Sequence, residues 1–413
     1  MPLPKHSLLS HRTRSARETC DWATPIARAC GVTRVAGITT LDHIGIPVYQ
    51  AFRPNAWSIS VSAGKGIDDH AARASALMEA IELAHAETVR PHGPPRAFHS
   101  ITGQPDEFLD PSWFAHPRAA PVIGDIPIHW LPGRDLLAHS SKTGLADDSA
   151  PVSWVPYDAV HCDFRMQTIA DTAAGAFRTT SNGLASGSTL AEAICHGLCE
   201  VVERHCLFEW VDTSREHRAG TKVALDSIDD EHVQRLLQQL ARADMITALW
   251  DMTGDLDIPV YRCAICDGSP DGFYALMPSL GAGCHPSTSH AIRRAITEAA
   301  QARLTVISGA REDISHAVYE AGNVPRLWEA QRAELQDTPA RRDIRDQPER
   351  INKHVETDIA WLLSRLADAG VERAVYVDLS RDDPGVPVVR VLVPGLRSPT
   401  PHADRGHIDD PGL

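Results

Sequence analysis

The stretch Ser181-Asn-Gly-Leu-Ala-Ser-Gly187, followed by Glu200-Val-Val-Glu-Arg204, gives the best indication of how this 413-residue chain folds. A serine–any residue–glycine phrase leads through small residues into an alanine-rich helical pattern, and this form occurs twice more. The other copies begin at Ser62-Ala-Gly-Lys-Gly66 and Ser279-Leu-Gly-Ala-Gly283. Strand-like and helix-like patterns alternate along the chain. We therefore expect an α/β (α+β) fold built from repeated strand–glycine loop–helix units.

An acidic pair recurs within these units. Glu200 and Glu203 lie 19 and 22 residues after the serine of their phrase, and Glu298 and Gln301 lie at the same two distances. In the first copy Glu79 and Glu82 lie at 17 and 20. We therefore expect the units to close around a shared site. A shorter phrase also recurs three times and opens a strand each time: Gly45-Ile-Pro-Val48, Ile258-Pro-Val260 and Gly385-Val-Pro-Val388.

Composition excludes several classes of function. There are 54 acidic residues against 40 Lys and Arg, a formal charge of −14. This balance argues against binding to nucleic acid or to an anionic membrane surface. The sequence has no bilayer-length apolar run and no secretory signal, so we expect a cytoplasmic protein. We expect an N-terminal tail over residues 1–10, one catalytic domain over 11–396, and a C-terminal tail over 397–413.

Two cysteine-based sites were weighed as alternatives. Cys263-x-x-Cys266, completed by Cys284-His285, would make a zinc site, but residues three apart on a strand point to opposite faces. Cys199 and His196 share a helix and would suggest a thiol nucleophile, yet no third group is evident to orient the histidine.

The glutamates share helix faces. Ser75, Glu79 and Glu82 span about 60° of one helix, and Glu192, Glu200 and Glu203 fall, with His196, within about 80° of the next. These are either the polar faces of amphipathic helices or a metal site. Three glutamates without a compensating lysine repel one another, and Mg²⁺, which prefers oxygen ligands and phosphate, would remove that cost. The glycines would let backbone N–H groups approach the phosphates closely.

With these motifs the sequence resembles the YcaO family of ATP-dependent enzymes that activate peptide-backbone amides, over roughly residues 11–396. The resemblance implies a YcaO-like fold around a site for ATP and Mg²⁺. It implies that Glu203 and Arg204 are catalytic. It implies Mg²⁺ ligands and nucleotide contacts at two sets of positions: Glu79, Glu82, Glu192, Glu200 and Glu203 for the metal, and Arg12, Ser15, Ser75, Ser188, Arg204 and Gln301 for the nucleotide.

Some positions depart from the family pattern. Leu8 stands where the family has a lysine, for which Lys5 or Arg12 would substitute, and Ser188 stands where it has an asparagine. Only Ser398-Pro-Thr-Pro401 resembles the Pro-x-Pro-x-Pro tail of cyclodehydratases. The phrase Leu41-Asp-His-Ile-Gly-Ile-Pro-Val48 is more similar to the branch that works with TfuA-type partners and makes thioamides.

The resemblance therefore implies a precursor peptide as substrate and a TfuA-like or leader-binding partner, and we expect a homodimer. Thioamide formation is expected first, azoline formation second, and amide hydrolysis or amidine formation third, with His196 or His205 as a possible acid/base. Two other classes stay open. One is a nucleotide-binding accessory protein without amide chemistry, and the other is a carboxylate-rich metal hydrolase that does not use ATP.

Overall fold

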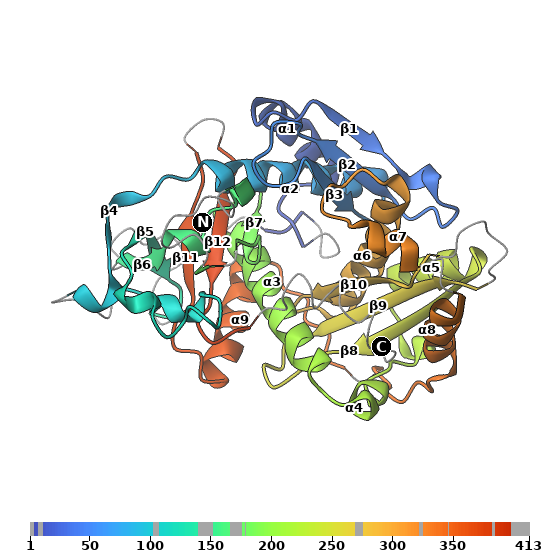
Figure 1. The fold of residues 1–413 in the computed structure, drawn as a ribbon. Coiled ribbons are helices and arrows are strands. Elements are labelled where there is room, and N and C mark those ends of the chain that lie inside the picture. Colours follow the sequence, from blue (N-terminus) through green and yellow to red (C-terminus); the bar gives the residue numbers. More distant parts are fainter. Residues whose placement is uncertain are drawn as a thin grey trace.

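A computed structural model describes residues 4–6, 11–101, 107–138, 152–165, 176–177, 179–268, 276–321, 325–345, 347–381 and 385–397. It is a mixed helix and sheet structure in which three antiparallel sheets surround a centre occupied by long helices (Figure 1). In the described part of the chain no helix is both long enough and apolar enough to cross a membrane.

Three units of the same order, helix–three strands–helix, make up most of the molecule. The amino-terminal unit comprises α1 (Ala16–Ala29), β1 (Arg34–Gly37), β2 (Val48–Phe52), β3 (Val61–Lys65) and α2 (Asp69–Thr88). The middle unit comprises α5 (Glu231–Arg242), β8 (Met245–Asp251), β9 (Val260–Asp267), β10 (Ser279–Cys284) and α6 (Thr288–Ser308). In each unit the strands pair in chain order, and the two helices pack against each other.

The third unit combines two distant parts of the chain, and we call it the composite unit. Its first helix and two strands come from the C-terminal region: α9 (Val355–Asp368), β11 (Val375–Asp378) and β12 (Val388–Leu392). Its last strand and helix come from the middle of the chain: β7 (Leu184–Ser186) and α3 (Leu190–Val211). β12 pairs with β11 on one side and β7 on the other, and α3 packs against α9. The composite unit thus repeats the other two by a permuted chain path.

The recurring proline–valine phrase marks the same strand in all three units. Val48 opens β2, Val260 opens β9 and Val388 opens β12, each the central strand of its unit. The repeat predicted from the sequence is therefore confirmed, and its two recurring phrases belong to one unit.

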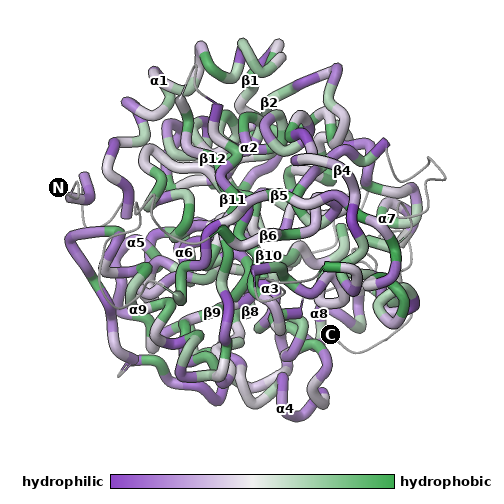
Figure 2. Tube along the Cα trace, turned by 90° about the vertical axis from the view of Figure 1, so that its left-hand side faces the viewer, coloured by the Kyte–Doolittle hydropathy of each residue, from purple (hydrophilic) through white to green (hydrophobic). Residues whose placement is uncertain are grey.

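The units close into a ring. α2 packs on its own β3 and on β7 of the composite unit, α3 packs on β7 and on β10, and α6 packs on β10 and on β3. Each long helix thus bridges to the edge strand of the next unit. In Figure 2 hydrophobic residues gather along these central elements and hydrophilic residues along the outer turns.

The remaining elements extend this ring. β5 (Ile128–Asp135) pairs with β11 and carries β4 (His92–Arg96) and β6 (Val152–Pro156), which lengthens the composite sheet outward. This lobe has its own aromatic core, which includes Phe108, Trp130 and Phe177. The short helices α4 (Arg215–Gly220), α7 (His316–Ala321) and α8 (Pro325–Asp337) complete the described elements of regular structure longer than a single turn.

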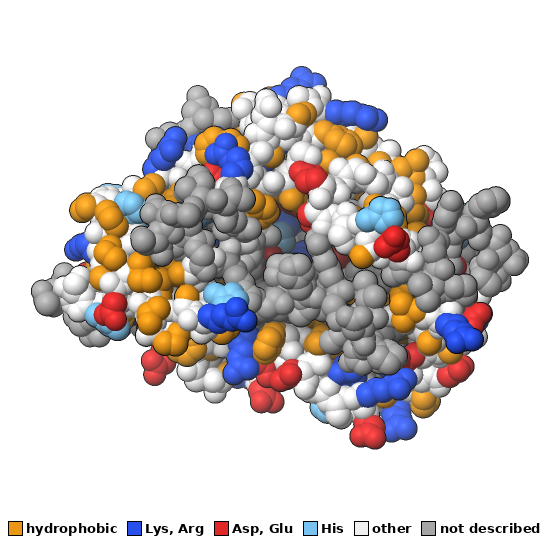
Figure 3. All heavy atoms as spheres, in the orientation of Figure 1, with side chains coloured by type: hydrophobic (Ala, Val, Ile, Leu, Met, Phe, Trp, Pro, Cys, Tyr) orange, Lys and Arg blue, Asp and Glu red, His pale blue; other side chains and the backbone are white. Residues whose placement is uncertain are grey.

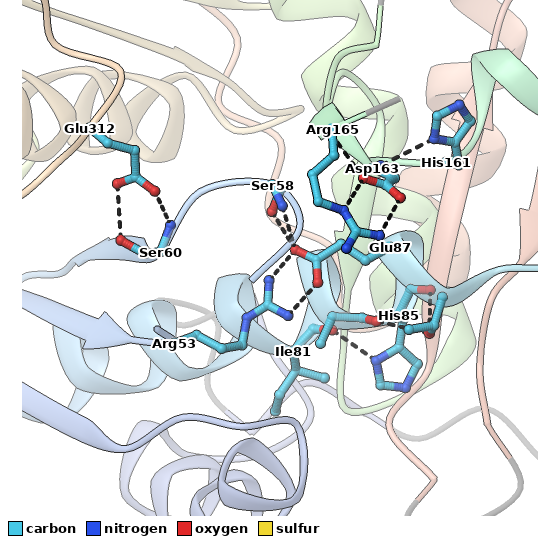
Figure 4. Close-up of polar contacts among 12 residues, drawn as sticks. Arg53, Ser58, Ser60, Ile81, His85, Glu87, His161, Asp163, Arg165 and Glu312 are labelled. Carbon is cyan, nitrogen blue, oxygen red and sulfur yellow. Dashed lines mark hydrogen bonds and ion pairs between the residues drawn. The ribbon is translucent and has the colours of Figure 1, made fainter. Parts of the chain in front are cut away.

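Helix α2 is fixed at its end by a buried ion pair (Figure 4). The Glu87 carboxylate accepts hydrogen bonds from Arg53 Nη1 at 2.7 Å and Nη2 at 2.5 Å, and also from the backbone N–H and hydroxyl of Ser58. A buried, fully paired carboxylate of this kind holds the loop after β2 in one position. That loop carries Ile59 to the wall of the cavity described next.

Candidate active site

The acidic pairs occupy equivalent positions once they are counted from the helix caps. Asp68, Thr189 and Ser287 are the N-caps of α2, α3 and α6, and each side chain accepts the N–H three residues further on. The same two positions, eleven and fourteen residues after the cap, carry the acidic pairs or their counterparts on each helix. They are Glu79 and Glu82 on α2, Glu200 and Glu203 on α3, and Glu298 and Gln301 on α6. The two-residue mismatch seen in the sequence therefore lies before the cap, in the strand and loop.

A cavity of about 2130 Å³ is lined by residues of all three units, including faces of α2, α3 and α6. The view in Figure 3 shows a hollow in this region with charged side chains inside it. The structure brings all eleven predicted site residues to the lining: Arg12, Ser15, Ser75, Glu79, Glu82, Ser188, Glu192, Glu200, Glu203, Arg204 and Gln301. Their individual roles remain predictions.

The residue fourteen positions after each cap joins its helix to the edge strand of the next unit. Glu82 accepts the N–H of Ser186 at 2.8 Å and its hydroxyl at 2.6 Å, and Glu203 accepts the N–H of Cys284 at 3.0 Å. Gln301 instead donates its amide to the carbonyl of Ala63 at 2.7 Å. The partner is a backbone acceptor here, which explains an amide in place of a carboxylate.

Glu192, the fifth glutamate, accepts hydrogen bonds from the segment that precedes α1. Glu192 accepts the N–H of Thr13 at 2.5 Å and its hydroxyl at 2.6 Å, and its other oxygen accepts the N–H of Ser188 at 2.9 Å. Burial raises its pKa, but the nearby Arg12 and these hydrogen bonds outweigh burial, so the pKa lies below its usual value. Glu192 is therefore ionised at neutral pH.

Most of the other carboxylates have raised pKa values. Burial brings the pKa of Glu79 and of Glu200 to about 7 and that of Glu82 to about 8, and it raises that of Glu203 as well. Several carboxylates that converge in one buried place and have raised pKa values favour a bound divalent ion. Their donor set, all oxygen, suits Mg²⁺, so the residues present fit this metal.

Several charged residues of the site were not among the predicted set. Glu298 lies eleven residues after its cap and forms an ion pair with Lys65. Burial raises the pKa of Glu298, but Lys65, Arg204 and Arg294 outweigh burial and hold the pKa below its usual value. The repeat itself had pointed to Glu298. Arg311 faces Glu79, and Arg390 on β12 faces Glu200. These arginines lie far from their partners in sequence, so no spacing signal reveals them.

The Ser-x-Gly glycines have a packing role that the sequence did not indicate. Gly64 and Gly281 lie inside β3 and β10, and a Cβ on them would meet the helix backbone at 2.1 Å from Ala76 N and 2.3 Å from Ala295 O. Gly183, at φ +78°, would meet Val391 O at 2.2 Å. These glycines allow close packing between backbones. Gly281 also lies in the cavity lining, and the approach of glycine N–H groups to phosphates stays a prediction.

Other sequence hypotheses can be placed as well. Ser15 caps α1 in a capping box with Glu18 while it lines the cavity. Arg12 lines the cavity, whereas Lys5 is absent from the lining and forms an ion pair with Asp358. Leu8 and the Ser398–Pro401 stretch lie outside the described residues.

The cysteine and histidine hypotheses also have outcomes. Cys263 and Cys266 are free and lie in different core clusters, as expected for opposite faces of β9. His196 lines the cavity, and burial together with Arg294, 3.4 Å away, lowers its pKa well below the usual value. His205 is absent from the cavity lining and accepts the N–H of Arg397.

One wall of the cavity is apolar. Met78 and Leu83 flank the glutamates on α2, and Phe114 and Phe164 face the same space. Trp113, beside Phe114, also lines the cavity and leaves 59% of its surface exposed. The lining therefore includes apolar side chains beside the glutamates of α2 and an exposed aromatic side chain, and we call this set the apolar wall.

Comparison with known proteins extends these observations. The model of the YcaO cyclodehydratase family, described as ATP- and Mg²⁺-binding, matches residues 63–397. An uncharacterised protein of the tfuA 3′ region of Rhizobium leguminosarum bv. trifolii is 36% identical over 383 residues, 90% of this chain and 85% of that protein. An uncharacterised protein of Methanothermobacter thermautotrophicus is 36% identical over 376 residues, 89% of this chain and 90% of that protein.

Solved structures share the fold. YcaO from Methanopyrus kandleri, bound with AMPPCP and Mg²⁺, gives a TM-score of 0.67 at 23% identity and covers 97% of this chain and 93% of its own. A heterocyclase in complex with substrate and cofactor gives 0.73 at 22% identity over 96% of this chain, which spans only 54% of that larger protein. ATP and Mg²⁺ are the cofactors of the matched family. The family match and the two relatives at 36% identity show that this chain belongs to the YcaO family.

Proposed function

We propose that this protein activates a backbone amide of a ribosomally made peptide with ATP and Mg²⁺, and that the product is a thioamide. The observation that carries the proposal is the convergence of Glu79, Glu82, Glu192, Glu200 and Glu203 on one cavity, from two helices of a ring. These five carboxylates would hold Mg²⁺, which neutralises phosphate charge when bound.

The chain's own residues would position the reactants. The N–H groups of Ser186 and Cys284 fix one oxygen each of Glu82 and Glu203, which leaves the second oxygen of each carboxylate for the cation. Arg204 lies among Glu200, Glu203 and Glu298, where a guanidinium suits a phosphate oxygen. In this scheme the amide oxygen takes a phosphoryl group and a sulfur nucleophile adds at the amide carbon. Phosphate then leaves with the former amide oxygen.

The size and lining of the cavity support a second reactant beside the nucleotide. Pockets for small ligands usually measure about 300–1000 Å³, and this cavity is larger at about 2130 Å³. We assign the apolar wall from Met78 and Phe114 to Trp113 to the substrate peptide. The relative from the tfuA region supports sulfur as the nucleophile and a TfuA-like protein as partner. A cytoplasmic location is part of the same proposal.

Two measurements test this function. Calorimetric titration with Mg-ATP should show binding, and its absence would contradict the nucleotide site. Phosphate release should then depend on a short precursor peptide encoded beside the gene and on sulfide, and mass spectrometry should find one oxygen replaced by sulfur. Loss of water from the peptide would instead indicate an azoline product, and binding of Mg-ATP without peptide-dependent release would favour an accessory protein.

A further inference from the structure

Lys5 is a buried lysine outside the cavity. Its side chain is 1% exposed, and Nζ lies 2.5 Å from Oδ2 of Asp358 on α9. The other oxygen of Asp358 accepts a hydrogen bond from Asn352 at 2.7 Å, and the Lys5 backbone N–H donates to the carbonyl of Lys353 at 2.9 Å. Lysine is seldom buried this fully unless it is paired, so this contact anchors the start of the described chain to the composite unit.

Three histidines pack beside this ion pair. The rings of His11, His285 and His290 lie with their centroids 4.2–4.4 Å apart. Burial and then the charge of Lys5 lower the pKa of His11 to about 3, so its imidazole is neutral, and its Nδ1 lies 3.3 Å from the Lys5 ammonium. His11 adopts φ +51°, a left-handed conformation that is uncommon for a residue other than glycine. The contacts around it must therefore stabilise this conformation.

This cluster has the spacing of a metal site. Donor atoms of His11, His285 and Asp358 all lie within 4.8 Å of one another, and all three residues are buried. Nitrogen and carboxylate donors at such distances suit zinc and related ions. However, the Lys5 ammonium contacts both Asp358 and His11, and it supplies the positive charge that such a site would otherwise take from a metal.

The residues that follow His11 lie against the nucleotide site. Thr13 donates its N–H and its hydroxyl to the same oxygen of Glu192, and Arg12 Nη1 lies 3.6 Å from the other oxygen. Ser15 lies two residues after Thr13 and lines the cavity. The position of Glu192 therefore depends on a segment that is itself held by His11 and Lys5.

We propose that Lys5 is a positioning residue whose ammonium is the resident cation of the His11–His285–Asp358 cluster, and that it holds residues 11–15 against Glu192. The consequence for nucleotide binding rests on the function proposed above. When Lys5 is lost, residues 11–15 detach from Glu192 in a fraction of the molecules. The apparent affinity for Mg-ATP then falls in proportion to the fraction of molecules in which the segment still contacts Glu192. We expect binding of Mg-ATP to be on the order of tenfold weaker, which corresponds to a detached segment in about nine of ten molecules.

The first experiment measures hydrogen–deuterium exchange of the peptide that contains Thr13, without nucleotide. Lys5→Met should speed exchange of the Thr13 amide, and Lys5→Arg should restore part of the protection. The double variant Lys5→Met/Asp358→Asn removes the pair without leaving a buried charge and should also exchange faster. Lys222→Met is the matched control, because Lys222 is buried and donates to two carbonyls at 2.6 Å far from Thr13. Equal Thr13 exchange in wild type and in both Lys5→Met variants would overturn the proposal.

Two titrations complete the test. Calorimetry should give about tenfold weaker Mg-ATP binding for Lys5→Met and wild-type affinity for Lys222→Met. Failure of the wild type itself to bind Mg-ATP would count against the proposed function, while Thr13 exchange would still decide the role of Lys5. Zinc chloride added to protein treated with EDTA should not bind stoichiometrically. Tight zinc binding that is lost in His285→Asn would overturn the proposal, because a metal would then be the cation of the cluster.

Discussion

Replacing Gly64 by alanine tests whether the recurring glycines pack helices or bind phosphate. A Cβ at Gly64 would lie 2.1 Å from Ala76 N, 2.3 Å from Ala72 O and 2.7 Å from Ala76 Cα, whereas ordinary contacts begin at 3.4 Å. All three atoms belong to the backbone of α2, so no side chain can rotate away. The helix has to withdraw from β3 by roughly 1 Å.

The expected cost follows from this overlap. Overpacked cores lose about 1–3 kcal/mol, and a clash with three backbone atoms of one helix places Gly64→Ala at about 3 kcal/mol, the upper end of that range. The same movement would displace Glu79 and Glu82, since both lie on α2, and nucleotide binding should weaken along with stability. A glycine that only touched phosphate would give a variant with weakened binding and normal stability.

Urea unfolding followed by circular dichroism is the assay, with Gly385→Ala as the control. A Cβ on Gly385 would have no atom within 4 Å, and Gly385 is not in the left-handed region, so its substitution should leave the midpoint unchanged or raise it slightly. A Gly64→Ala midpoint equal to that of Gly385→Ala would refute the packing explanation. Normal stability with weakened Mg-ATP binding would instead favour a phosphate-binding role for Gly64.

Three further predictions concern the site and its support. Glu203→Gln should abolish peptide-dependent phosphate release while the melting temperature stays near that of the wild type, because an amide oxygen can still accept the Cys284 N–H; unchanged release would remove Glu203 from the site. In EDTA, stability should fall as pH rises from about 4.5 to about 8, by up to about 1.4 kcal/mol per pH unit for each group, and should then level off. The reason is that Glu79, Glu82 and Glu200 have folded pKa values of about 7–8, above the usual value of 4.5, so the folded state holds protons that the unfolded state has already lost. Scanning fluorimetry should show this loss without Mg²⁺ and little of it with Mg²⁺, and a pH-independent melting temperature in EDTA would contradict the prediction. Arg53→Met should lower the free energy of unfolding in urea by about 3–5 kcal/mol, because it leaves the Glu87 carboxylate buried without its partner. Arg235→Met, in an exposed pair, should lower it by less than about 0.5 kcal/mol. Similar losses for the two variants would argue against burial as the cause.

The sequence predicted the repeated unit because its signals are local. A glycine loop, an alanine-rich helical pattern and two acidic residues three apart lie close together in sequence, as Gly66, Glu79 and Glu82 do. The proline–valine phrases are equally local, and they mark the central strand correctly in every unit.

The parts that the sequence could not predict depend on contacts between distant segments. Lys65 meets Glu298 and Thr13 meets Glu192 only because the ring closes. The ion pair of Lys5 could not be predicted for the same reason, because its partner Asp358 lies 353 residues away on α9. The role of Gly64 depends on how near α2 approaches β3, which composition alone does not reveal.

The permuted path of the composite unit has a consequence for synthesis on the ribosome. The amino-terminal and middle units are each contiguous in sequence, and each can form its sheet soon after its last strand has emerged. β7 and α3 are made in the middle of the chain, yet the strand that pairs with β7 ends at Leu392. Glu192, Glu200 and Glu203 all lie on α3. The strand before this helix, β7, therefore stays unpaired until β12 has been translated. A nascent chain halted before β12 would hold two assembled sheets and no complete metal site, so nucleotide binding is expected to be among the last properties that the protein acquires.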